Sequence, residues 1–104
     1  MKTVRVTYTA RQEYAGQNQQ NIQKVMSDLQ QLNHPGLLYH CCVNADGKTF
    51  VHTAFFKSEQ DERVLLDLPS FKSFQQQLMA SGPEVPPKQE LPAFVGSSHN
   101  MFNA

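Results

Sequence analysis

Hydrophobic and polar residues alternate along residues 3–9, which is the two-residue period of a β-strand with one buried face. Two more β-rich runs, 37–44 and 49–56, are joined by Asp46-Gly47. Asp-Gly between such runs favours a hairpin with a two-residue type I′ turn. The pattern therefore predicts three strands, of which the second and third pair directly.

A helical period replaces the alternation in two other stretches. In the first, a polar loop at residues 10–17 is expected to lead into a helix that ends before Pro35, with an apolar side formed by Ile22, Val25, Met26, Leu29 and Leu32. In the second, Ser58 can cap a helix and Pro69 interrupts it. Its apolar positions are Val64, Leu65, Leu68, Phe71, Phe74 and Leu78.

A proline-rich connection at residues 83–89 precedes a last strand predicted at residues 90–96. The order β-α-β-β-α-β predicts an α+β, ferredoxin-like fold, with a four-stranded antiparallel sheet and both helices on one face. We expect one domain over residues 1–96 and a polar tail over 97–104.

The hairpin register predicts two apolar faces. If Asp46-Gly47 is the whole turn, one face carries Leu37, Tyr39, Cys41, Val43, Phe50, His52, Ala54 and Phe56. The other carries Leu38, His40, Cys42, Val51, Thr53 and Phe55. Helices can cover only one of these faces, so the sequence predicts a homodimer formed sheet against sheet. His40 would then face the partner, where it could make dimerisation sensitive to pH or simply form a hydrogen bond across the interface.

Composition narrows the choice of partners and compartment. Nine basic and nine acidic residues among 104 give a formal charge of zero, which argues against nucleic-acid binding. No apolar run is long enough to span a membrane, and the chain starts with a strand pattern instead of a signal peptide. Cys41 and Cys42 are adjacent on a strand and point to opposite faces, so free thiols in the cytoplasm are expected.

Three segments resemble a known superfamily: PGLL at 35–38, FFKS at 55–58 and LPSFKSF at 68–74. They are similar to the dimeric α+β barrel superfamily, and most similar to its antibiotic biosynthesis monooxygenase-like group. The resemblance implies a small homodimer that oxidises phenolic or quinol-like substrates with no cofactor, neither metal nor flavin. It extends over nearly the whole chain, but this superfamily includes several chemistries.

Three positions depart from that group. Phe56 stands where the group often has Trp, Ala54 where an acidic residue is frequent, and Ser70 where a His is common. Each difference removes a polar or large aromatic group from the pocket between the sheet and the helices.

The helix-facing side of the sheet holds the candidate site. His52 lies opposite Cys41, with Tyr39 beside them and Tyr8 within reach from the first strand. His52 could act as a general base or as a hydrogen-bond donor to a phenol or enol, with Tyr39 and Tyr8 orienting it. The apolar walls of this pocket would be Phe56, Phe71 and Phe74.

The same residues have other interpretations. Cys41 with His52 could be a nucleophile or half of a metal site, although no third ligand or orienting carboxylate is visible at useful spacing. A half-buried His on a strand is often structural, and a buried Cys often behaves as a small hydrophobe. Three functions therefore remain open: an oxygenase, a non-catalytic module that binds a small apolar ligand, and a dimer whose pocket is filled by its own phenylalanines.

Overall fold

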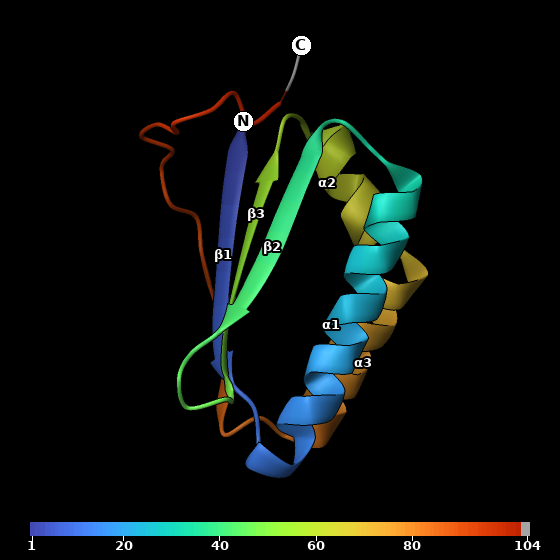
Figure 1. The fold of residues 1–104 in the computed structure, drawn as a ribbon, viewed down its shortest axis with the longest axis vertical. Coiled ribbons are helices and arrows are strands. Elements are labelled where there is room, and N and C mark those ends of the chain that lie inside the picture. Colours follow the sequence, from blue (N-terminus) through green and yellow to red (C-terminus); the bar gives the residue numbers. More distant parts are fainter. Residues whose placement is uncertain (103–104) are drawn as a thin grey trace.

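A computed structural model describes residues 1–102 of the chain. The elements in these residues are β1 (Lys2–Thr9), α1 (Gln12–Leu32), β2 (Leu37–Val43), β3 (Thr49–Phe56), α2 (Glu59–Leu66), α3 (Pro69–Ser81) and β4 (Val85–Glu90). The strands form one antiparallel sheet in the order β2-β3-β1-β4, and all the helices lie on one of its faces (Figure 1). This confirms the predicted ferredoxin-like β-α-β-β-α-β fold.

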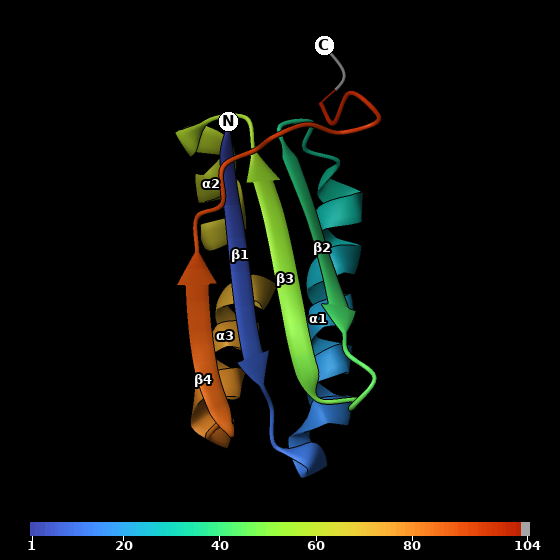
Figure 2. The ribbon, with the colours of Figure 1, turned by 90° about the vertical axis from the view of Figure 1, so that its left-hand side faces the viewer.

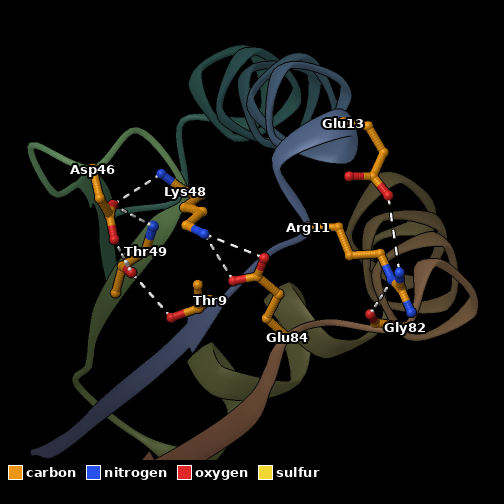
Figure 3. Close-up of polar contacts among 8 residues, drawn as sticks. All are labelled: Thr9, Arg11, Glu13, Asp46, Lys48, Thr49, Gly82 and Glu84. Carbon is orange, nitrogen blue, oxygen red and sulfur yellow. Dashed lines mark hydrogen bonds and ion pairs between the residues drawn. The ribbon is translucent and has the colours of Figure 1, made fainter.

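The predicted hairpin register is correct, but its turn is different. Gly47 has a φ of 75°, whereas the φ of Asp46 is negative, so the type I′ prediction is wrong. The Gly47 N–H donates to the Asn44 carbonyl at 2.9 Å, which closes a type I turn followed by a left-handed glycine. The Asp46 carboxylate accepts hydrogen bonds from the backbone N–H groups of Lys48 and Thr49 (Figure 3). These hydrogen bonds stabilise a connection that is longer than the predicted two-residue turn, and they do not require a positive φ at Asp46.

The helix-facing side of the sheet forms the core. Tyr39 lies opposite Ala54 and Cys41 opposite His52, as predicted. The most deeply buried aromatic residues are Tyr8 on β1 and Phe50 on β3, which are directly paired and each 1% exposed.

Helix α1 begins earlier than predicted, because residues 12–17 are helical and do not form a loop. Its buried side continues toward the N-terminus through Asn18 and Ala15, which are 0% and 7% exposed. A small residue and a polar one carry little hydrophobic signal, so the hydrophobic pattern of the sequence did not extend to the true start of the helix. At the other end, Asn33 adopts the left-handed conformation (φ 51°) and donates its N–H to the Leu29 carbonyl.

The helical region after the hairpin is divided as predicted. The Ser58 hydroxyl accepts from the Asp61 N–H and caps α2. Pro69 occupies the first turn of α3, where its missing N–H costs no helical hydrogen bond.

The last strand is not where it was predicted. Residues 91–96 have no regular secondary structure, and β4 is formed by the proline-rich stretch Val85–Glu90. Proline is tolerated there because β4 lies at the edge of the sheet, and its pairing with β1 is interrupted between Thr7 and Thr9. Polar contacts connect the segments beside the start of β4. Lys48 forms an ion pair with Glu84 at 2.9 Å, and the Arg11 Nε donates to the Gly82 carbonyl (Figure 3).

After β4 the chain crosses the face of the sheet that the helices leave open (Figure 2). There Phe94 packs edge-on against Phe55, with ring centroids 6.2 Å apart. The predicted tail, 97–104, has no helix or strand over 97–102, and residues 103 and 104 lie outside the described part. Among the helices of residues 1–102, none is both long enough and apolar enough to cross a membrane.

Candidate functional site

A cavity of about 300 Å³ lies between the sheet and helices α2 and α3. Most of its lining is apolar: Val4, Val6, Ala54, Phe56, Leu65, Leu66, Phe71, Phe74, Leu78, Met79 and Pro87. Its polar lining residues are Tyr8, Tyr39, His52, Glu62, Gln75 and Gln89. Leu66 and Met79 are 39% and 58% exposed, so the cavity reaches the surface of the protein at their position. A space of this kind suits a small, largely apolar molecule.

A chain of hydrogen bonds forms one polar side of the cavity. The Asn18 Nδ2 donates to the Tyr8 hydroxyl at 2.7 Å, and that hydroxyl lies 2.8 Å from His52 Nε2. On the other side of the imidazole, the Tyr39 hydroxyl lies 2.5 Å from His52 Nδ1. The four residues come from α1, β1, β3 and β2.

The sheet register brings these rings together. Tyr8 is paired with Phe50 and Tyr39 with Ala54, so each tyrosine is a diagonal neighbour of His52 on an adjacent strand. The Tyr8 and Tyr39 rings stack on the imidazole at centroid distances of 5.3 and 5.8 Å. From the helix side, Phe74 approaches the imidazole at 5.4 Å and excludes water from it.

Burial determines the charge of this group. His52 is 5% exposed, and this burial lowers its pKa from 6.5 to about 4. Burial also raises the pKa of Tyr8 and of Tyr39 well above the usual value for tyrosine. At neutral pH all three residues are therefore uncharged, and His52 is a hydrogen-bonding group more than a strong base.

The structure places most of the predicted site residues along the cavity. Those that line it are Tyr8, Tyr39, His52, Phe56, Phe71 and Phe74. Cys41 lies outside this lining, and burial raises the pKa of its thiol to about 12, so it remains protonated at neutral pH. Three positions differ from the antibiotic biosynthesis monooxygenase-like group that the sequence resembles. Of these, Ala54 and Phe56 line the cavity, whereas Ser70 lies in a groove between α1 and α3.

Sequence reasoning missed Asn18. It directly follows the stretch 10–17 that was predicted to be a loop, and an Asn in a polar segment carries no hydrophobic signal. Its spacing of four from Ile22 and seven from Val25 places it on the same helical face as these buried residues. That spacing is the signal that would have identified it. Among residues 1–102, no group of three or more His, Cys, Asp or Glu side chains could hold a metal ion.

Comparison with solved structures identifies the fold. A crystal structure of an antibiotic biosynthesis monooxygenase superposes with a TM-score of 0.76 at 14% identity, covering 92% of this chain and 100% of that one. SnoaB, a cofactor-independent oxygenase from Streptomyces nogalater, gives 0.69 at 14% identity over 95% and 97% of the two chains. Rv0793 from Mycobacterium tuberculosis gives 0.76 at 13% identity over 94% and 98%.

No family model and no curated protein sequence matches this chain. At these levels of identity the superpositions establish the architecture, and the chemistry has to be argued from the cavity itself. The predicted structural resemblance is confirmed: the chain has the fold of the antibiotic biosynthesis monooxygenase-like structures.

Proposed function

We propose that the protein binds a small aromatic, quinol or enolic molecule in the cavity and oxidises it with O2 as a cofactor-independent monooxygenase. The observation that carries this proposal is the contrast within the cavity: its lining is mostly apolar but includes Tyr39, whose hydroxyl is hydrogen-bonded to His52. Such a site holds a flat apolar molecule and fixes its oxygen atom at one place. The cofactor-independent oxygenase SnoaB, which shares the fold, supports this choice of chemistry.

The protein's contribution is to stabilise the ionised substrate. A quinol or enol that loses its proton to solvent at the open side of the cavity leaves a negatively charged oxygen. Tyr39 stays protonated at neutral pH and can donate a hydrogen bond to that oxygen in a dry site, where the bond is stronger than in water. The anion then transfers an electron to O2, and the two radicals combine to a peroxide. For an activated methylene, this peroxide loses its remaining C–H proton to solvent as the O–O bond breaks and hydroxide leaves, and the hydroxide takes a proton from solvent. The sum is CH2 + O2 → C=O + H2O, so the substrate supplies every electron.

Oxygen consumption tests this proposal. Purified protein is mixed with a panel of quinols, phenols and enols, and O2 uptake is followed with an electrode for wild type, Tyr39→Phe and His99→Gln. His99 lies in the exposed tail and serves as the matched control. We expect uptake with at least one compound, about 100-fold slower turnover for Tyr39→Phe, and no change for His99→Gln. Equal turnover in wild type and Tyr39→Phe would refute the assigned role.

A non-catalytic binding module is the second candidate. The low pKa of His52 favours it, because an imidazole with such a low pKa is a weak base toward a substrate proton. Ala54 and Phe56 add no polar group to the lining either. Calorimetric binding of a panel compound without any O2 uptake would favour this candidate over the oxygenase.

We also propose that two copies associate through the open face of the sheet. Leu38, Val51 and Phe55 lie there only half-buried, and the tail covers part of the face through Phe94. A second copy would remove the remaining apolar surface from water. Sedimentation analysis of Phe55→Asp and Thr53→Asp tests this, since a charge buried in the interface should give monomers. A wild-type monomer, or dimers that survive both changes, would contradict the proposal.

A further inference from the structure

The buried hydrogen-bond chain imposes an order on its protons. Tyr8 is 1% exposed, and its hydroxyl already accepts a hydrogen bond from the Asn18 amide. Its single proton must therefore be donated within the protein, and the other hydrogen-bond partner of this hydroxyl in residues 1–102 is His52 Nε2. If that proton had no acceptor, an unsatisfied buried donor would destabilise the fold.

The remaining positions follow from this first assignment. An imidazole that accepts at Nε2 and is neutral carries its proton on Nδ1. Nδ1–H then donates to the Tyr39 oxygen, 2.5 Å away. The hydrogen of Tyr39 itself is left free to turn away from His52, toward the cavity that Tyr39 lines. A proton on Nε2 would reverse the chain and leave the Tyr8 hydrogen buried with no acceptor.

The amide of Asn18 determines the direction of the whole chain. Its Oδ1 is buried without a hydrogen-bond partner in the described residues. If the amide were rotated so that its oxygen faced Tyr8, the NH2 group would be buried in that place instead. An unpaired carbonyl oxygen is tolerated more readily than unpaired N–H donors, so the orientation with Nδ2 toward Tyr8 is the less costly one.

We propose that Asn18 is a positioning residue which, through Tyr8 and His52, makes Tyr39 a hydrogen-bond donor toward the cavity. The site then selects ligands that present an acceptor oxygen to Tyr39, such as a quinone, another carbonyl or an ionised phenol. Aromatic molecules that offer only N–H donors are disfavoured. The ligand selectivity rests on the function proposed above, whereas the order of the protons does not.

The tautomer of His52 is measured directly by NMR. In protein labelled with 15N, a ring nitrogen that carries a proton differs widely in chemical shift from one that does not. We expect wild type to carry the proton on Nδ1. In Asn18→Leu, which has a similar shape but no amide, the preference should decrease and both tautomers should be populated. Asn21→Leu is the matched control on the same helix, because the Asn21 amide contacts Tyr14 and Gln77 instead of Tyr8. A wild-type proton on Nε2 would overturn the assignment whether or not Asn18→Leu folds.

Calorimetry with matched probes tests the selectivity. We expect 1,4-naphthoquinone, which offers only acceptors, to bind about tenfold more tightly than 1-naphthylamine, the difference that one hydrogen bond provides. The preference should disappear in Tyr39→Phe and weaken in Asn18→Leu. Equal affinities in wild type would refute the selectivity. If neither probe binds although Nδ1 carries the proton, the ligand site is refuted and the proton order stands.

Discussion

Acid should destabilise this protein through His52 at pH values where its carboxylates are still ionised. Burial lowers the pKa of His52 from 6.5 to about 4, so the unfolded chain binds a proton that the folded chain does not bind between these pH values. Stability therefore decreases as the pH falls from 6.5 toward 4. Below 4 both states carry the proton and this contribution stops changing. At pH 7 neither state is protonated to any great extent, so the full stability is present there.

The size of the effect follows from the difference between the two pKa values. Proton linkage gives a loss of about 2 kcal/mol at pH 5 relative to pH 7, and about 3 kcal/mol at pH 4. Losses of this size are a large fraction of the stability of a small domain. Tyr8, Tyr39 and Cys41 face the imidazole from the neighbouring strands, and burial keeps their pKa values raised, so they stay neutral throughout this range. From the helix side, the acidic residue that lines the same cavity as His52 is Glu62 on α2.

Urea unfolding followed by far-ultraviolet circular dichroism measures this loss at pH 7, 6, 5 and 4.5. Protein concentration is held fixed, because dimerisation would couple to stability. In His52→Gln, the free energy of unfolding should change much less between pH 7 and pH 5, since Gln does not titrate. His99→Gln controls for the loss of an exposed histidine and should follow wild type. If wild type loses less than about 0.5 kcal/mol between pH 7 and pH 5, the burial argument for His52 is wrong.

Three substitutions test the fold by urea unfolding at pH 7. Tyr8→Phe leaves the Asn18 amide and His52 Nε2 without their shared partner and should cost about 1–3 kcal/mol, whereas no loss would show that the chain of hydrogen bonds does not stabilise the fold. Gly47→Ala meets no neighbour within 4 Å, but its φ of 75° disfavours a side chain, so we expect a loss of about 1 kcal/mol. Gly36→Ala places a Cβ on the Asp61 carboxylate and should cost about 1–3 kcal/mol by overpacking. A smaller loss for Gly36→Ala than for Gly47→Ala would contradict this packing.

The sequence was sufficient to predict the strands and their register where side chains alternate. The face shared by Tyr39 and His52 followed from the pairing across the hairpin, because every side chain on a strand alternates with a period of two. The turn itself was mispredicted, but the register survived because the Asn44 N–H donates to Thr49 and continues the ladder into the longer connection.

The errors arose where tertiary packing decides the structure. The prolines in Val85–Glu90 indicate a linker unless this segment is an edge strand. That it is an edge strand depends on its pairing with β1, which the local sequence does not contain. Asn18 was missed because the value of a buried amide comes from Tyr8, which lies ten residues earlier. Whether a cavity exists between Phe74 and Tyr39 depends on how closely α3 approaches the sheet. The hydrophobic pattern of the sequence does not give this distance.

The position of the prolines also limits how copies of this protein can join through their strands. The two edges of the sheet are β2 and β4, and β4 contains Pro86 and Pro87, which lack the N–H groups needed to bind another strand. Continuous sheets that run from molecule to molecule require two usable edges on every copy. Here β2 could pair with β2 of a second copy, and such a pair closes on itself. Strand pairing through β4 is therefore disfavoured, which works against extension of this sheet into fibres.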